Sequence, residues 1–164
     1  MDIITALKER RSVRGFTQKP IPSDLIEKVI DCGRFAPTAR NIQPWEFVVV
    51  TDKKSLGEIA SLAENGPFIK NCACCVAVFC QETKYYLEDG CAATVNIMTA
   101  AHALGIGSCW VAGDKKPYAD KIAGILKVPA GFKLASLIAL GYPAEEPSLP
   151  SKKPLKDIIH WENF

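Results

Sequence analysis

The sequence has no hydrophobic run long enough to cross a bilayer. We expect no amino-terminal signal peptide, because Lys8, Glu9 and Arg10 interrupt the first apolar stretch. It also has little excess charge: the 164 residues carry a net charge of only +2, whereas a general nucleic-acid binder normally has a strongly basic face. With 48% hydrophobic and 23% charged residues, the chain is not disordered. We therefore expect one domain over residues 1–164, located in the cytoplasm, with no membrane or nucleic-acid partner.

Two common phosphate-binding loops are missing as well. No Walker A sequence is present. The one candidate for a dinucleotide-binding fingerprint, Gly105-Ile106-Gly107, has Trp110 at the third glycine position, and it lies between a predicted helix and a predicted strand. The fingerprint requires the reverse order, so the alternation of strands and helices does not indicate a Rossmann fold. A bound phosphate would have to be held mainly by arginine side chains.

Cysteine, in contrast, is plentiful. Four of the seven cysteines crowd into one short segment, at Cys72, Cys74, Cys75 and Cys80. Their C-x-C-C spacing differs from the C-x-x-C pairs that typically bind zinc or iron-sulfur clusters. The segment has the apolar pattern of a buried strand, in which cysteine behaves as a small hydrophobe. We expect reduced thiols in the core, and a thiol-rich metal-binding protein is the alternative.

Hydrophobic periodicity predicts alternating helices and strands. The predicted helices cover residues 2–8, 23–36, 53–63, 86–104 and 118–126, and the predicted strands cover 45–50, 75–80, 108–112 and 134–140. Ser23 is the expected N-cap of the second helix, and Pro37 ends that helix. Residues 142–164 form a proline-rich extended tail that becomes apolar again from Leu155.

The predicted helix over residues 86–104 is apolar on nearly every side from Cys91 onward. Such a helix needs burial on all sides, and one small domain rarely supplies that much cover. We therefore expect a homodimer with this helix at the interface and with the tail wrapped around the partner subunit.

The first fourteen residues end in a basic cluster, Arg10-Arg11-Ser12-Val13-Arg14. Guanidiniums match phosphate oxygens in bidentate geometry and stay charged at any relevant pH, and a serine hydroxyl adds a short hydrogen bond. The cluster therefore suits a bound phosphate, while a solvated basic turn is the alternative.

Four motifs in register resemble the nitroreductase family of flavin enzymes: residues 10–14, 36–45, 104–110 and 140–145. The resemblance covers essentially the whole chain. It implies an α+β fold, a three-layer α/β/α sandwich with a mainly antiparallel central sheet. It also implies a homodimer that holds FMN noncovalently at the subunit interface and uses NAD(P)H as co-substrate.

The resemblance implies roles for two groups of residues. The basic motif of the family contacts the phosphate, ribityl chain and pyrimidine edge of FMN, which implies cofactor contacts for Arg10, Arg11, Ser12 and Arg14, with Arg14 beside N1 and O2. A loop of the partner chain lies against the flavin, and its counterparts here are Pro37, Thr38, Ala39 and Asn41, with Gln43 next to them.

Further contacts are implied at two places. Asn65 matches an asparagine that hydrogen-bonds the flavin pyrimidine. In the segment that begins at Val111, the backbone N–H that faces flavin N5 belongs to either Ala112 or Gly113.

Four more residues complete the expected site. Lys152 and Lys153 stand where the family usually has an arginine that reaches the phosphate, and lysine keeps the charge but loses the bidentate fork. Tyr85 and Tyr86 precede the long helix and are expected to form a stacking wall for a flat substrate, with ordinary packing as the alternative.

The expected chemistry is hydride transfer from NAD(P)H through bound flavin to nitroaromatics, quinones or similar flat acceptors, in a ping-pong mechanism. No catalytic side chain is expected: His102 lies in the apolar helix as a satisfied structural histidine, and His160 lies in the tail. A flavin-binding module with little turnover is the alternative. The sequence does not select between NADH and NADPH, or identify the physiological acceptor, and it does not distinguish dehalogenation or flavin cleavage from nitro reduction.

Overall fold

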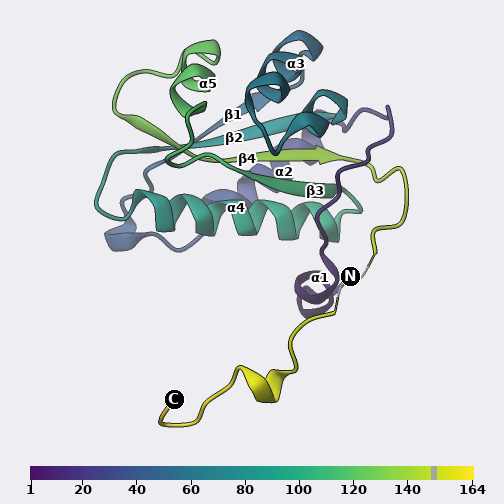
Figure 1. The fold of residues 1–164 in the computed structure, drawn as a ribbon, viewed down its shortest axis with the longest axis vertical. Coiled ribbons are helices and arrows are strands. Elements are labelled where there is room, and N and C mark those ends of the chain that lie inside the picture. The colour runs from purple at the N-terminus through teal and green to yellow at the C-terminus, as the bar shows by residue number, and fades with distance from the viewer. Residues whose placement is uncertain (149–150) are drawn as a thin grey trace.

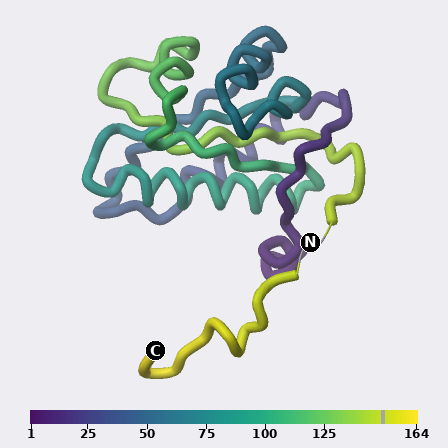
Figure 2. The backbone as a smooth tube through the Cα atoms, viewed as in Figure 1, coloured from purple at the N-terminus to yellow at the C-terminus, as the bar shows by residue number. Residues whose placement is uncertain are grey.

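A computed structural model of the protein describes residues 1–148 and 151–164, and its body has three layers. Helices α2 and α4 cover one face of a central sheet, and α3 and α5 cover the other (Figure 1). The short helix α1 lies beyond the end of α4, close to the start of the tail (Figure 2). The expected α+β sandwich is confirmed.

The five predicted helices are present, with shifts of one or two residues at their ends. They are α1 (Ile3–Glu9), α2 (Ser23–Arg34), α3 (Lys53–Leu62), α4 (Tyr86–Ala103) and α5 (Ala119–Ile125). Three short 3-10 turns accompany them, η1 (Ala39–Asn41), η2 (Pro67–Asn71) and η3 (Leu155–Asp157).

Side chains cap α1 and α3, but not α2. The Asp2 carboxylate accepts hydrogen bonds from two backbone N–H groups of α1, and Asp52 accepts one from Ser55 in α3. The predicted N-cap role of Ser23 is wrong. The carbonyl of Pro22 already accepts the N–H groups of Leu25 and Ile26, so Pro22 is the N-cap residue and Ser23 is the first residue of α2.

The sheet is antiparallel throughout, in the order β1-β2-β4-β3. Its strands are β1 (Trp45–Val50), β2 (Cys74–Gln81), β3 (Gly107–Ala112) and β4 (Phe132–Gly141). The two central strands are buried on both faces, which explains why β2 is an uninterrupted apolar run. The two outer strands, β1 and β3, each have one edge that pairs with no other strand of the sheet.

The cysteine-rich segment is mainly β2, as predicted, and the pleat divides its thiols between the two faces of the sheet. Cys74 and Cys80 belong to the core beneath α2 and α4, whereas Cys72 and Cys75 belong to the core beneath α3 and α5. Burial raises the pKa of the Cys72 thiol to about 11 and that of Cys74 to about 12. All seven cysteines lie in the described part of the chain and are free. Thiols on opposite faces of a sheet cannot share one metal ion.

Residues 10–17, the N-terminal segment, pass from α1 across the end of the sheet, beside the start of β3 (Figure 2). The Val13 N–H donates to the Ser108 carbonyl at 2.9 Å, and Ser12 and Ser108 form a parallel bridge. Farther along, the Thr17 N–H donates to the Tyr142 carbonyl at 2.9 Å. These bonds fix the basic cluster against the start of β3.

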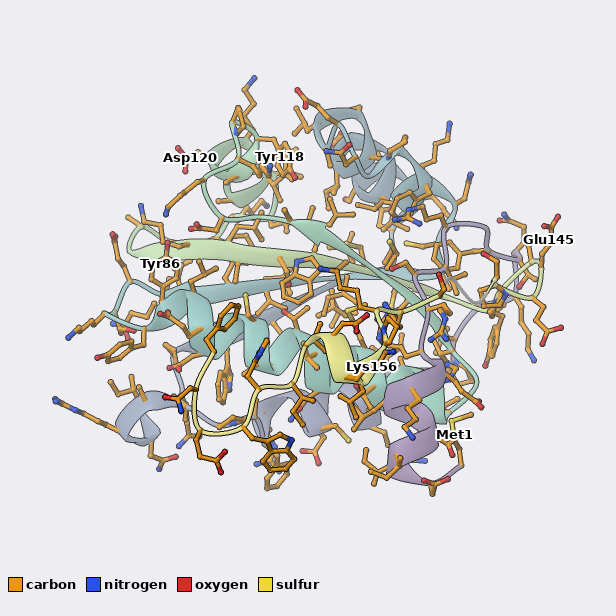
Figure 3. All side chains as sticks on the ribbon, turned by 60° about the horizontal axis from the view of Figure 1, so that its bottom comes forward. Met1, Tyr86, Tyr118, Asp120, Glu145 and Lys156 are labelled. Atoms are coloured by element: carbon orange, nitrogen blue, oxygen red, sulfur yellow. The ribbon has the colours of Figure 1, made fainter. Side chains whose placement is uncertain are left out.

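One side of the body exposes many apolar groups. Within its own chain α4 is not covered on all sides, because Val95 is 46% exposed, and the burial of this helix in a dimer stays a prediction. Ile3, Leu7 and Val95 line a groove of about 410 Å³ between α1, α2 and α4. The tail leaves the body on this side, with η3 standing away from it (Figures 1 and 3). Within the described residues, none of the helices has the length and hydrophobicity that a membrane span needs.

Helix α4 approaches the sheet closely at Gly90, and this contact generates a stability prediction. A Cβ at Gly90 would lie 2.7 Å from the Ala135 Cβ and 2.9 Å from the Cys80 Sγ. We expect Gly90→Ala to lower the free energy of unfolding by about 1–3 kcal/mol in chemical denaturation, because the core would be overpacked. Gly57→Ala in α3 is the matched control, since a Cβ there meets nothing within 4 Å. That variant should gain about 0.5–1 kcal/mol, and equal stability of the two variants would contradict the packing account.

Candidate functional site

The basic cluster begins at the end of α1, where Arg10 is the C-cap residue. The Arg11 side chain turns back along the chain: its Nη1 donates to the carbonyls of Lys8 and Arg10 at 2.6 and 2.8 Å. Arg11 therefore stabilises the end of the helix and keeps only part of its guanidinium for another partner. Arg10 forms no such bond to the backbone of α1 in the described structure.

A cavity of about 210 Å³ lies beside this cluster, which we call the basic cavity. Its lining includes Arg10, Arg11, His102 and Ser108, from α1, the N-terminal segment, the end of α4 and the start of β3. Each of the four contributes a buried polar atom that has no hydrogen-bond partner among the described residues: Arg10 Nη1, Arg11 Nε, His102 Nε2 and Ser108 Oγ. Buried polar groups are rarely left unpaired, and here most of them are donors, so the cavity suits an anion.

The prediction that His102 is a satisfied structural histidine is therefore wrong. His102 lies in the last turn of α4 and lines the basic cavity together with the two arginines, and its Nε2 is buried without a partner among the described residues. Burial lowers the pKa of His102, and the positive charges of Arg10 and Arg11 lower it further, whereas Glu9 raises it. Neither Ser108 nor His102 was predicted as a site residue, because a position on a helix or strand does not reveal which distant segment covers it.

Arg14 lies farther along the N-terminal segment, on the same rim as Asn65 and the end of β3. Its guanidinium carbon is 5.9 Å from the ring centroid of Phe68. Next to that ring, Gly66 packs against β3 so closely that a Cβ there would lie 3.3 Å from the Val111 side chain. Asn65, the neighbour of Gly66, is exposed. Three of the expected contacts are thus brought together by η2 and β3.

The ladder between β3 and β4 distinguishes the two candidate N–H groups at the end of β3. The Gly113 N–H donates to the Ala135 carbonyl at 3.3 Å and is already used. Because backbone groups alternate in direction along a strand, the N–H and C=O of Ala112 point outward, as the Ser108 carbonyl does. The buried Tyr118 hydroxyl donates to the Ala112 carbonyl and fixes this peptide. The N–H of Ala112 remains at the free edge.

The expected partner-contacting loop is ordered by a buried carboxylate. Asp89, which is 5% exposed, accepts a hydrogen bond from the Thr38 hydroxyl at 2.8 Å and another from the Ala39 N–H at 3.2 Å. The Thr38 hydroxyl in turn accepts the Gln43 N–H, and the Gln43 side chain donates to Asn41 Oδ1, both at 3.0 Å. Sequence reasoning missed Asp89, although an acidic residue in the first turn of a buried helix is a signal that could have found it.

Within one chain, this loop and the basic cavity lie at opposite ends of α4. The loop, residues 37–43, is held by Asp89 in the first turn, and the cavity is lined by His102 in the last turn. These two residues are separated by roughly 20 Å along the helix axis at about 1.5 Å per residue. Figure 1 shows η1 and α1 near opposite ends of α4. One chain therefore does not bring all of the expected contacts together.

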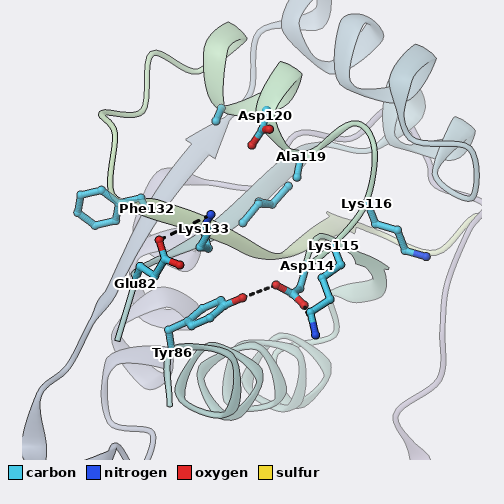
Figure 4. A pocket seen from close by; sticks show the side chains of 11 residues that line it. Glu82, Tyr86, Asp114, Lys115, Lys116, Ala119, Asp120, Phe132 and Lys133 are labelled. Atoms are coloured by element: carbon cyan, nitrogen blue, oxygen red, sulfur yellow. Dashed lines mark hydrogen bonds and ion pairs between the residues drawn. The ribbon is translucent and has the colours of Figure 1, made fainter. Parts of the chain in front are cut away.

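The two expected substrate residues differ in their surroundings. Tyr85 is 40% exposed. The Tyr86 hydroxyl donates to Asp114 Oδ1 at 2.5 Å, and this bond raises the pKa of Tyr86 to about 12. Both Tyr86 and Asp114 line a pocket of about 350 Å³ between the start of α4 and α5 (Figure 4). Tyr86 thus anchors the loop that follows β3 through its bond to Asp114. Lys115, in the same loop, also lines this pocket.

The two expected tail contacts, Lys152 and Lys153, are exposed. Within the described residues, neither lysine forms an ion pair.

The fold and the site together define a class of protein. An antiparallel α/β/α sandwich presents buried, unpaired guanidinium donors at a cavity beside the start of β3 and a free backbone N–H at the end of the same strand. These groups fit a ligand that joins a phosphate to a flat heteroaromatic ring, as a flavin mononucleotide does.

Comparison with known proteins identifies the family. The model of the Nitroreductase family matches residues 7–82 and 81–142, and the chain belongs to this family. A protein of Methanothermobacter thermautotrophicus, provisionally named an NADH dehydrogenase/NAD(P)H nitroreductase, is 33% identical over 155 residues, which cover 90% of this chain and 80% of that protein. The crystal structure of an FMN-dependent nitroreductase from Clostridium difficile is 30% identical with a TM-score of 0.92, covering 98% of this chain and 99% of the other.

A further solved structure contains a bound cofactor. It is a provisionally named nitroreductase from Desulfovibrio desulfuricans in complex with FMN, and it is 26% identical with a TM-score of 0.88. The match covers 100% of this chain and 98% of that one.

The buried carboxylate beneath the loop of residues 37–43 generates a second stability prediction. Asp89→Ala removes both hydrogen bonds to the loop, and hydrogen bonds to charged groups contribute about 1.5–3 kcal/mol each. We expect the free energy of unfolding to fall by at least this amount. Asp31→Ala is the control, because it removes only the exposed ion pair with Arg34, which is worth roughly 0.5 kcal/mol or less. Similar losses in the two variants would show that Asp89 does not anchor the loop.

Proposed function

We propose that this protein binds FMN in a site shared between two copies of the chain, takes hydride from NAD(P)H and reduces flat acceptors such as nitroaromatics or quinones in a ping-pong cycle. Membership of the nitroreductase family makes the chain an NAD(P)H-dependent FMN oxidoreductase. The observation that carries the site assignment is the set of unpaired donors in the basic cavity, on the same edge of β3 as the free Ala112 N–H.

When bound, FMN supplies the hydride chemistry, and the protein supplies binding, orientation and electrostatics. Arg10 binds the phosphate with a charge-assisted hydrogen bond, Arg11 adds its Nε, and the exposed Ser12 hydroxyl contacts the same end of the cofactor. Arg14 places a permanent positive charge beside N1 and O2 of the ring. Asn65 binds the pyrimidine edge.

The end of β3 orients the ring. Ala112 donates its free N–H to N5. The peptide that carries this N–H is held by the pairing of Val111 with Leu137 in β4, and the Tyr118 hydroxyl holds the next peptide through the Ala112 carbonyl. Burial raises the pKa of Tyr118, which keeps its hydroxyl protonated as a donor. Val111 and Gly113 support the same segment from the core side, with the Gly113 N–H committed to β4.

A second copy of the chain completes the site. The loop that contains Pro37, Thr38, Ala39, Asn41 and Gln43 lies too far from Arg10 in its own chain to meet the same ligand, so we place it against the flavin of the partner. The exposed apolar groups of α1, α4 and the tail, Leu7, Val95 and Trp161 among them, supply the surface that such a dimer buries. Lys152 and Lys153 then reach the phosphate from the tail.

Two alternatives make different predictions for the purified protein. A flavin-binding module would bind FMN with little turnover, and a thiol-rich metal-binding protein would be colourless. We expect a yellow protein with one FMN per chain that oxidises NADH or NADPH when a quinone is present. A colourless protein with stoichiometric zinc or iron would contradict the proposal, although the division of the β2 thiols between two faces does not favour that result.

The phosphate anchor is tested by Arg10→Ala. Loss of a charge-assisted contact costs about 1.5–3 kcal/mol, so we expect FMN to bind at least tenfold more weakly in a fluorescence titration. Lys152→Ala should show a smaller loss, because its side chain is exposed and lacks the bidentate fork of an arginine. Riboflavin lacks the phosphate and should bind the wild type and Arg10→Ala equally. Unchanged FMN affinity in Arg10→Ala would overturn the assignment.

Assembly is tested by sedimentation of the FMN-loaded protein. FMN that contacts two chains stabilises the dimer by mass action, so holoprotein should stay dimeric at concentrations at which the apoprotein dissociates. Leu7→Glu should disrupt the dimer and lower FMN occupancy, whereas Val49→Glu on β1 is a control at a similarly exposed apolar position. A monomer with full flavin occupancy would contradict the shared site.

The acceptor wall is tested by Tyr85→Ala and Tyr86→Ala. Aromatic stacking contributes about 0.5–1.5 kcal/mol, so KM for nitroaromatics and quinones should rise several-fold, while flavin reduction by NAD(P)H in stopped flow changes less. Tyr86→Phe keeps the ring and removes only the bond to Asp114, which separates stacking from anchoring. If acceptor kinetics are unchanged and only thermal stability falls, the tyrosines are packing residues.

A further inference from the structure

We infer that His102 and Ser108 are additional ligands of the phosphate in the basic cavity, and that His102 couples phosphate binding to the uptake of a proton. This inference rests on the proposed function, since FMN supplies the phosphate monoester. It adds two residues, from the end of α4 and the start of β3, to a site that the basic motif alone would assign to the N-terminal segment.

The Ser108 hydroxyl is the most constrained group in the cavity. Ser108 is 1% exposed and lines the cavity, its carbonyl is held by the Val13 N–H, and its Oγ is buried without a partner among the described residues. A serine that serves only packing normally turns its hydroxyl to a nearby carbonyl. A phosphate oxygen in the cavity would supply the missing acceptor.

His102 faces the same space from the other side. Its Nε2 is buried and unpaired in the described structure, and the cavity that it lines also contains unpaired donors of Arg10 and Arg11. A phosphate needs several donors that converge from different directions, and a volume of about 210 Å³ admits a group of that size. Only a protonated imidazole, or the tautomer with its proton on Nε2, can donate from this position.

The charges around His102 determine the direction of the coupling. The charged groups that act on His102 are Glu9, at the end of α1, and the guanidiniums of Arg10 and Arg11. Met1 also lines the cavity. Burial and the two guanidiniums lower the pKa of His102 in the absence of an anion, which leaves the imidazole neutral near pH 7. A phosphate dianion beside it raises that pKa again, so binding draws a proton onto the imidazole.

The advantage that His102 gives should therefore depend on pH. It is largest at low pH, where the imidazole is protonated in the bound state, and it is lost as pH rises through the pKa of the bound form. The phosphate itself also titrates near pH 6. It gains its second negative charge as pH rises, and this strengthens its binding to arginines, whereas the contribution of His102 weakens. Comparing wild type with His102→Gln at each pH cancels that contribution, because both proteins bind the same ligand.

Isothermal titration calorimetry of FMN binding to the apoprotein tests the coupling. Titrations at pH 7 in two buffers of different ionisation enthalpy measure proton uptake. We expect net uptake by the wild type, less uptake by His102→Gln, and none with riboflavin. From pH 5.5 to 8 the ratio of the two FMN Kd values should fall from about tenfold toward one. A ratio that stays at one, or an equal loss of riboflavin affinity in the variant, would overturn the role of His102.

Ser108→Ala provides an independent arm. It should weaken FMN binding up to about tenfold at every pH, with riboflavin affinity and proton uptake unchanged. Unaltered FMN affinity would remove Ser108 from the site. Inorganic phosphate should compete with FMN and not with riboflavin; phosphate that binds alongside FMN would assign the cavity to another phosphate and overturn the inference. Failure of the proposed function would instead appear as no FMN binding to the wild type.

Discussion

The outer edge of β3 is the constraint on which the rest of the structure depends. An uncovered strand edge leaves N–H and C=O groups without partners, and here two different elements cover it. The N-terminal segment covers the start of the strand through the bond from Val13 to Ser108, and the Tyr118 hydroxyl takes the Ala112 carbonyl near its end. The charged cluster is therefore positioned by backbone hydrogen bonds, while the Ala112 N–H stays available at a fixed place.

Glycines make this arrangement possible because they let the N-terminal segment approach the sheet closely, and not because they contact a phosphate. A Cβ at Gly107 would lie 2.9 Å from the Val13 side chain, and one at Gly141 would lie 2.6 Å from the Phe16 ring. Gly105 has a φ of +75° and ends α4, since its N–H donates to the His102 carbonyl. The glycines that resemble part of a dinucleotide fingerprint thus serve the turn from α4 to β3 and the packing of the N-terminal segment.

The elements were predictable from the sequence because their signals are local. The apolar run of β2 and the helical stripe of α2 indicate strand and helix wherever the rest of the chain lies. The family motifs also indicated Arg10 and the end of β3. Other features depend on distant pairs: Asp89 meets Thr38 across 51 residues, and the choice between Ala112 and Gly113 depends on the register of β3 against β4. If β3 moved by one residue against β4, the Gly113 N–H would point outward in place of the Ala112 N–H. The sequence of β3 alone does not fix this register.

The electrostatics of the basic cavity and the length of α4 connect cofactor, stability and assembly. Two guanidiniums and a histidine line one cavity, and both guanidiniums disfavour the protonated imidazole, so a bound anion would offset their effect on His102. The same helix carries His102 at one end and Asp89, which holds the loop of residues 37–43, at the other. In a symmetric pair of chains, each α4 would reach one site with its last turn and the other site with its first. A ligand that fixes the residues at one end of α4 would then also favour the correct placement of the residues at its other end, because a regular helix keeps the distance and orientation between its two ends.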